Sequence, residues 1–380
     1  MKSWLVPLVA VICLSEAVAQ LPSDAAVLED LNPEELSQEL GSEEPDEKKK
    51  ERIWGNSFFA VPIPVSNPTF GNGLAVGAVY FYPQTQEQKE VQPASVTGVA
   101  GFYSDNDSLA FGVGHQSYWG GDKWRLGGAA GYIDLKLDLV NPANDGGNTD
   151  IDWLLEGSLF VGKLSRRIHG DWYAGLLVRW LDIDQTFDFQ LVPDNLELGT
   201  NNRAAGVGLQ IEFDSRDNPF NPYQGQLFKA GATVTEATSG ALEQTYQSYN
   251  AEYRQFHDLR DNLVLGWNIR ACHRSDGFPL WDACTVGLRG FNITNFLGRT
   301  TASAQAEVRW RFHGRWGAVA FAGVGGHDRS YGRRNETETV PSLGFGIRWM
   351  VLESQRVNVR LDLAWSDDDN AVYLAVGEAF

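Results

Sequence analysis

Residues 356–365 read RVNVRLDLAW, and this stretch decides the fold class. Polar side chains at Arg356, Asn358, Arg360 and Asp362 alternate along it with apolar ones. Because successive side chains of a β-strand point to opposite faces of the sheet, a period of two predicts a strand with unlike faces. The charges on one face indicate that this face meets water.

The same alternation recurs along most of the chain. Residues 206–213 read GVGLQIEF, residues 307–312 read EVRWRF, and residues 343–349 read LGFGIRW. A soluble β-sandwich would alternate too, with its apolar face turned inward. Here the other face carries charges and many glycines, as a water-filled lumen permits, and 12% of the chain is aromatic. The pattern predicts an all-β, transmembrane antiparallel β-barrel, and the net charge of −18 excludes nucleic acid as a partner.

About sixteen strand-like runs can be counted, with fourteen as the alternative. They lie near 57–65, 72–83, 93–103, 107–118, 123–139, 153–165, 171–183, 202–214, 226–236, 244–257, 261–271, 301–312, 315–325, 338–350, 355–365 and 370–380. An even number brings both termini of a closed barrel to the periplasmic side. The longest connection, near 272–300, follows the eleventh run and is therefore expected on the extracellular side.

The first 52 residues differ from the rest of the chain. Lys2, an apolar core and the small residues Ala17-Val18-Ala19 predict a signal peptide over residues 1–19, with a short membrane anchor as the alternative. Residues 20–52 carry eleven acidic residues against four basic ones, which predicts a disordered periplasmic tail. Residues 53–380 are predicted to form the barrel, which lies in the outer membrane.

Cys272 and Cys284 are the cysteines that remain after signal removal, and eleven residues separate them. Two thiols in an exported chain predict a disulfide. Metal binding is the alternative, although only the adjacent His273 could accompany the two thiols. We expect no metal and no cofactor.

The last run ends on Phe380, with Val376 on the same face of the expected strand. An alternating final strand that ends in an aromatic residue resembles the C-terminal sorting signal of outer-membrane proteins. Glu378 departs from the apolar pattern. The host barrel-assembly machinery would read such a signal and assemble the protein.

Four motifs, in order along the chain, resemble the BamA/TamA-type (bacterial surface antigen) family of outer-membrane barrels. The tetrapeptide LRGF at 288–291 resembles the family's hydrophobic-Arg-Gly-aromatic motif in a long sixth extracellular loop. The stretch FDSRDNP at 213–219 resembles the family's periplasmic turn after the eighth barrel strand. Glu307-Val308-Arg309 resembles a Glu-aromatic-Arg motif in the family's twelfth strand. The first part of the barrel sequence, around Pro62 and Pro64, is similar to the corresponding part of short members of this family.

The resemblance implies that the long loop folds into the lumen. Arg289 would pair there with Glu307, since a guanidinium offers a permanently charged fork to a carboxylate. Leu288, Gly290 and Phe291 would complete the anchor, with Gly290 allowing a close turn and Phe291 packing on lumen aromatics. The family has a further Asp on the next strand, but residues 321–325 read FAGVG here. We therefore expect a weaker or differently partnered anchor.

The family's insertion and secretion proteins carry periplasmic POTRA domains, and residues 20–52 are too short for one, which predicts a short member lacking them. The sequence shows no recognisable set of catalytic residues, so we do not expect an enzyme. Two function classes remain open. The barrel would aid insertion or transport of protein or lipid, or it would be a passive channel or structural barrel. Expected partners are outer-membrane lipid and other outer-membrane or periplasmic proteins.

Overall fold

The computed structural model describes residues 58–67, 71–140, 150–189, 196–290, 297–328, 337–366 and 370–380. Sixteen strands form one antiparallel sheet, and each strand pairs with its neighbours in chain order. The predicted signal peptide and acidic tail lie outside the described residues.

The strands of the sixteen-stranded sheet are β1 (Phe58–Asn67), β2 (Gly71–Phe81), β3 (Val96–Ser104), β4 (Leu109–Trp119), β5 (Trp124–Val140), β6 (Asp150–His169), β7 (Trp172–Phe189), β8 (Leu196–Asp214), β9 (Gly225–Ser239), β10 (Leu242–Arg260), β11 (Leu263–Arg274), β14 (Thr300–His313), β15 (Trp316–Asp328), β16 (Thr337–Leu352), β17 (Val357–Ser366) and β18 (Asn370–Val376).

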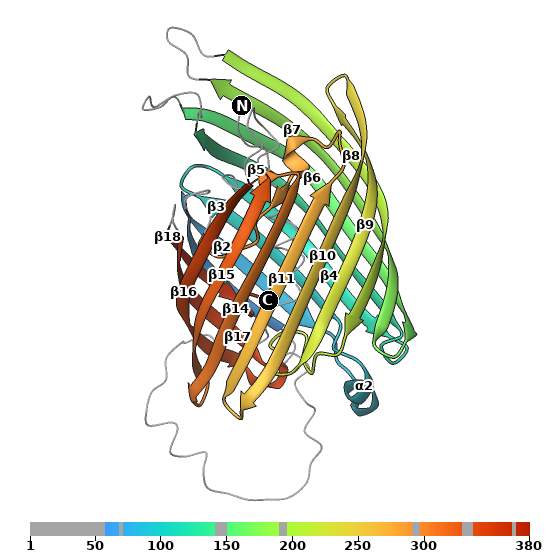
Figure 1. The fold of residues 1–380 in the computed structure, drawn as a ribbon, viewed down its shortest axis with the longest axis vertical. Coiled ribbons are helices and arrows are strands. Elements are labelled where there is room, and N and C mark those ends of the chain that lie inside the picture. Colours follow the sequence, from blue (N-terminus) through green and yellow to red (C-terminus); the bar gives the residue numbers. More distant parts are fainter. Residues whose placement is uncertain are drawn as a thin grey trace, which may run out of the picture.

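The prediction of about sixteen antiparallel strands is confirmed, and the sheet curves into a cylinder (Figure 1). Between β11 and β14 the chain adds a short pair of strands, β12 (Cys284–Thr285) and β13 (Leu297–Gly298). It also adds a single 3-10 turn, η1 (Leu280–Asp282). These small elements belong to the long connection that the sequence predicts after the eleventh strand.

The cylinder is not closed by hydrogen bonds at its seam, which corrects the prediction of a closed barrel. β1 and β18 lie next to each other, but among the described residues no ladder joins them. Two features of the strands explain this. β18 has only 7 residues, and Pro62 and Pro64 of β1 have no N–H group to donate.

The two faces of the sheet differ as the alternation predicts. In β17, Leu361 and Trp365 are 40% and 36% exposed, whereas Asn358 and Asp362 are 5% and 0% exposed. Large apolar side chains on the outer face include Leu176, Val207, Leu209, Leu343 and Phe345. Buried charged side chains include Arg125, Glu212, Arg254, Glu307, Arg309 and Arg348. Arg356 is an exception, because it precedes β17 in a left-handed conformation after the 3-10 turn η3 (Glu353–Gln355).

Strand length divides the cylinder into two regions. The strands from β5 to β10, which we call the tall wall, have 15 to 20 residues. The strands that flank the seam are shorter, with 10 residues in β1, 9 in β3 and 10 in β17. The green and yellow strands therefore extend beyond the blue and red ones at the upper end (Figure 1).

The two ends of the cylinder also differ. Tight turns join β4 to β5, β6 to β7, β10 to β11 and β14 to β15 at one end, the turn rim. The helix α2 (Gln86–Val91) lies there between β2 and β3 (Figure 1). Aromatic pairs beside this rim are Trp119–Trp124, Trp172–Phe213, Trp310–Phe312 and Trp316–Trp349. Such pairs are typical of an aromatic girdle at a membrane interface. In the described part of the chain, no helix has the length and apolar character needed to cross a membrane.

The C-terminal residues turn away from the strand that the sequence predicts for them. β18 ends at Val376, and Gly377 follows with a φ of +83°. Glu378 is buried and accepts hydrogen bonds from Asn358 and from Arg348, the latter at 2.8 Å. Phe380 is 3% exposed and packs against Phe256. The prediction that the strand continues to Phe380 is therefore wrong, because buried cations draw Glu378 inward.

Candidate functional site in the barrel lumen

The candidate site is the loop of residues 275–290, the inner loop, which lies against the inner face of the sheet. Phe278, Trp281 and Ala283 pack into the apolar cluster on the inner side of the tall wall. Further along, Arg289 reaches strands on the seam side of the cylinder. The inner loop therefore has two points of attachment on different parts of the wall.

The first attachment, the seam-side anchor, is centred on Arg289, which is 8% exposed. Its Nη2 donates to Glu307 Oε2 on β14 at 2.6 Å, and its Nη1 donates to Asp362 Oδ2 on β17 at 2.8 Å. Nη2 also donates to Gln305 at 3.0 Å. The guanidinium carbon lies 3.4 Å from the ring centroid of Phe321 on β15. One side chain thus contacts three strands of the seam side.

The backbone of the same segment is held by β16, β17 and β18. Ser342 donates a hydrogen bond to the carbonyl of Arg289, and Ser366 donates to the carbonyl of Gly290 at 2.8 Å. The N–H of Gly290 donates to the Tyr373 hydroxyl at 2.8 Å. Gly290 has a φ of +97°, a conformation that favours glycine. The expectation that Gly290 allows a close turn agrees with this geometry, whereas Phe291 lies outside the described residues.

Residues 321–325 of β15 carry two glycines that the side chains of the inner loop pack against. A Cβ on Gly325 would lie 2.3 Å from Val286 Cγ1, and a Cβ on Gly323 would lie 2.9 Å from Leu288 Cδ2. The glycines thus leave room for two apolar side chains of the inner loop. The second carboxylate comes instead from Asp362, two strands further around the sheet. The anchor is therefore differently partnered.

The anchor belongs to a larger buried charge network. Glu307 also accepts from Arg309 at 2.6 Å, and Asp362 also accepts from Arg348 at 2.5 Å. Arg309 donates in turn to a main-chain carboxylate oxygen of Phe380 at 2.7 Å. Buried charges are tolerated when each is paired and hydrogen-bonded, so these contacts depend on one another. The network connects the inner loop to the C-terminal residues.

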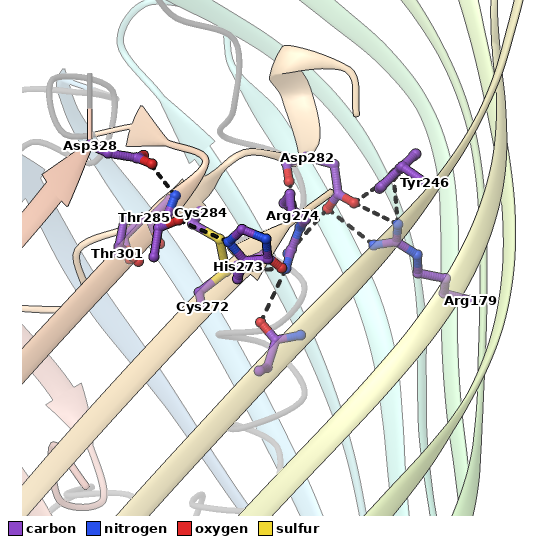
Figure 2. Close-up of a disulfide and its surroundings, with 12 residues drawn as sticks. Arg179, Tyr246, Cys272, His273, Arg274, Asp282, Cys284, Thr285, Thr301 and Asp328 are labelled. Atoms are coloured by element: carbon purple, nitrogen blue, oxygen red, sulfur yellow. Dashed lines mark hydrogen bonds and ion pairs between the residues drawn. A yellow bond between two sulfur atoms is a disulfide. The ribbon is translucent and has the colours of Figure 1, made fainter. Parts of the chain in front are cut away.

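The second attachment, the tall-wall anchor, is centred on Asp282 of η1 (Figure 2). Arg179 of β7 donates to both carboxylate oxygens, at 3.0 and 2.5 Å, and the Tyr246 hydroxyl of β10 donates to Oδ2 at 2.5 Å. Arg274 of β11 donates to the Asp282 carbonyl at 2.8 Å. Asp282 has 0% exposure. The carboxylate therefore ties the inner loop to three strands.

The charge state of Asp282 follows from these partners. Burial alone would raise the pKa of its carboxyl group, because it disfavours the charged form. Arg179 and Arg274, together with the hydrogen bonds from Arg179 and Tyr246, outweigh burial and hold that pKa below its ordinary value. Asp282 is consequently ionised at neutral pH and attracts both guanidinium groups.

A covalent bond lies between the two anchors. Cys272 of β11 and Cys284 of β12 form a disulfide, which confirms that prediction (Figure 2). The neighbouring Thr285 carbonyl accepts a hydrogen bond from the Thr301 hydroxyl of β14 at 2.9 Å. His273 contacts Thr300. Within the described ranges, no three His, Cys, Asp or Glu side chains are grouped so that they could hold a metal ion.

The tall-wall anchor is the part of the site that sequence reasoning missed. Arg179 and Asp282 are separated by 103 residues, and Tyr246 and Asp282 by 36. The one available signal is that Arg179 stands between Val178 and Trp180, whose apolar side chains point to the opposite, outer face of the strand. That signal places a cation in the lumen but does not say which loop residue meets it.

Comparison with known proteins gives a consistent result. A model of the Omp85 superfamily domain matches residues 116–380. Similar solved structures are BamA from Haemophilus ducreyi lacking POTRA domains 1-3 (12% identity, TM-score 0.50), CdiB from Acinetobacter baumannii (12%, 0.54) and CdiB from Escherichia coli (15%, 0.55). Each alignment covers 84% of this chain, and it covers 68%, 59% and 62% of those chains respectively. No curated protein is similar enough in sequence to be matched.

Proposed function

We propose that this chain, which belongs to the Omp85 superfamily, helps to insert or transport protein or lipid at the outer membrane through its β1–β18 seam. Barrels of this superfamily are outer-membrane proteins. In the proposed orientation the turn rim, where β18 ends, faces the periplasm, and the inner loop enters from the extracellular side. Outer-membrane lipid and other outer-membrane or periplasmic proteins are the proposed partners. The host barrel-assembly machinery would assemble the chain.

The observation that carries this proposal is the seam itself. β1 and β18 lie side by side, yet no ladder joins them in the part of the chain that the structure describes. Unpaired strand edges present N–H and C=O groups that can pair with another strand. Opening such a seam breaks few backbone hydrogen bonds, so an incoming strand or a lipid could pass at low cost.

The seam-side anchor supports the same proposal. Arg289 and Gly290 contact β14, β16, β17 and β18, the strands that lead to the seam. With the inner loop attached, these strands are held in one arrangement. We propose that release of Arg289 accompanies opening, and that the tall-wall anchor keeps the loop in the lumen meanwhile.

The test is a covalent staple across the seam. Ala60→Cys is combined with Val372→Cys, because both residues are exposed and lie on the adjacent strands β1 and β18. Ala60→Cys with Leu374→Cys is the second pairing. The oxidised protein, reconstituted in liposomes, should lose the ability to accelerate folding of an added outer-membrane barrel. The protein before cysteine oxidation should retain it.

The matched control staples a ladder that already exists. Ala306 of β14 and Ala322 of β15 are directly paired, so an Ala306→Cys, Ala322→Cys protein should keep full activity when oxidised. Equal activity of stapled and unstapled seam variants would contradict the proposal. Loss of activity in the control as well would show that oxidation, not closure, is responsible.

A passive channel is the second candidate, and a lumen cavity of about 560 Å³ favours it. This reading predicts steady conductance in planar bilayers that rises when residues 285–295 are deleted. It also predicts that the seam staple leaves conductance unchanged. We propose no enzymatic role, because both anchors of the inner loop consist of guanidinium–carboxylate pairs, which hold the loop in place and activate no nucleophile.

A further inference from the structure

The cavity beside the inner loop has a surface that the proposed function does not use. It has a volume of about 560 Å³ and lies between the inner loop and the inner faces of β4 to β11 and β14. Asp282, Cys284 and Gly287 of the inner loop form part of its lining. Its size falls in the range of about 300–1,000 Å³ that is usual for small-molecule sites.

The cavity is cationic in a strongly acidic protein. The chain has a net charge of −18, yet five cationic side chains line the cavity against two carboxylates, Glu252 and Asp282. The cationic side chains are Lys163, Arg179, Lys229, Arg270 and Arg274. A concave surface of one sign concentrates ions of the opposite sign.

Most of these cations already have a partner. Arg179 and Arg274 hold Asp282, and Arg270 donates to Glu252 at 2.8 Å. Lys163 lies 3.1 Å from Glu212, just outside the cavity. The guanidinium groups also donate hydrogen bonds to neighbouring acceptors: Arg179 donates to the Thr235 hydroxyl oxygen, and Arg274 donates to the Asn250 amide oxygen.

Lys229 differs from the others. It is in register with Glu212 on β8 and with Glu252 on β10. Glu212 is engaged by Arg125, Lys163 and Gln210, and Glu252 by Arg254 and Arg270. Among the described residues, Lys229 makes no ion pair within 4.0 Å. Its ammonium group is therefore the surplus charge of the cavity.

A second polar group also indicates a ligand in this cavity. Ser248 lines the cavity from β10 and is 1% exposed, and its hydroxyl oxygen has no hydrogen-bond partner. Buried polar groups are normally hydrogen-bonded, so an unpartnered hydroxyl next to a cavity indicates that a ligand supplies the missing contact. Ser248 and Lys229 lie on the neighbouring strands β10 and β9, at register positions four residues apart.

We propose that this cavity binds a small soluble anion that carries carboxylate or phosphate groups. Lys229 supplies the charge for the anionic group, and Ser248, four residues away in register, supplies a hydrogen bond to the far end of a larger anion such as citrate. Charge-assisted hydrogen bonds from an ammonium group to a carboxylate or phosphate are stronger than neutral ones. The site lies between the two anchors of the inner loop, so a bound anion would contact the segment that crosses the lumen.

The test is isothermal titration calorimetry of the full chain in non-ionic detergent micelles, with citrate and inorganic phosphate as probes. We expect saturable binding that weakens as sodium chloride is added, because salt screens the attraction. Lys229→Met should weaken binding by about tenfold or more, and Lys229→Arg should largely retain it. Lys136→Met is the matched control, since Lys136 pairs with exposed Asp107 away from the cavity.

Several results would overturn the proposal. They are no saturable binding of either probe, equal binding by the Lys229→Met and wild-type chains, or equal loss in the Lys136→Met control. Binding of short-chain phosphatidic acid without citrate or phosphate would assign the site to a lipid headgroup instead. Should Lys229→Met fail to fold, Ser248→Ala takes its place, with binding expected several-fold weaker and unchanged binding counting against the site.

Discussion

The tall wall and the seam side of the cylinder are built in different ways. β6, β8 and β10 of the tall wall have 19 or 20 residues and are paired on both edges. Their inner face carries the largest apolar cluster, which includes Trp153, Leu155 and Phe187. β1 and β18 are short, and in the described residues no hydrogen-bonded ladder joins their adjacent edges. On that side the inner face carries the network of Arg289, Glu307, Asp362 and Arg348.

The difference shows where each region obtains its stability. Long ladders and apolar burial stabilise the tall wall, and Phe278, Trp281 and Ala283 of the inner loop add to that burial. The seam side has fewer ladder bonds, and charged contacts made through the inner loop connect its strands. Because removing one partner from a buried ion pair is costly, the seam side should respond strongly to a change in the loop.

The strongest expected effect comes from Arg289→Ala. It leaves Glu307 and Asp362 buried with one cation fewer, and should lower the free energy of unfolding by about 3–5 kcal/mol. The measurement is urea unfolding in detergent or liposomes. Arg203→Ala is the control, because the Arg203–Asp182 pair has side chains that are 66% and 31% exposed, and such pairs contribute about 0–1 kcal/mol. Equal losses in the two variants would remove the distinction between the regions.

A smaller effect is expected from Asp282→Asn at the tall-wall anchor. The amide keeps the shape but loses the charge that faces Arg179 and Arg274, so we expect a loss of about 2 kcal/mol at neutral pH. Faster proteolysis of the inner loop, with the barrel intact, would localise the change. Asp107→Asn is the control, since the Asp107 side chain is 68% exposed.

The stabilities of the wild-type and Asp282→Asn chains should also differ in their dependence on pH. The folded-state pKa of Asp282 lies below its ordinary value of 3.8. Its stabilising contribution is therefore complete above that value and is lost as pH falls through the folded-state pKa. The wild-type chain should lose its advantage over Asp282→Asn as the pH is lowered below about 4. A difference that is constant from pH 7 to pH 2 would contradict the assignment.

The smallest effect is expected from Gly325→Ala. The added Cβ would lie 2.3 Å from Val286 Cγ1, so the inner loop must shift, at a cost of about 1–2 kcal/mol. Gly101→Ala is the control on another seam-side strand, because its nearest contact would be 3.8 Å away. A lower heat-modifiability transition in the first variant alone is the expected result. Identical transitions would show that Val286 does not pack as described.

Several features could be predicted from sequence because their causes are local. The alternation at 356–365, the Gly, Asn and Asp turns and the sixteen runs follow from backbone geometry within a few residues. Arg289 and Glu307 could be related because a recognisable motif carries them, and the cysteine pair followed from count and compartment. The strand ends were less predictable, since β18 stops at Val376 where the contact of Glu378 with Arg348 outweighs the alternation.

The sequence by itself determined the period-two strands, their approximate number, the charged inner face of the seam side and the position of the arginine-bearing loop. Only the tertiary structure decided that Asp362 rather than a residue of β15 completes the Arg289 contact and that Asp282 meets Arg179. It also decided that no ladder joins β1 and β18 within the described residues. The physical reason is distance along the chain. A strand's faces depend on neighbouring residues, whereas contacts across a lumen depend on how sixteen strands curve and stagger together.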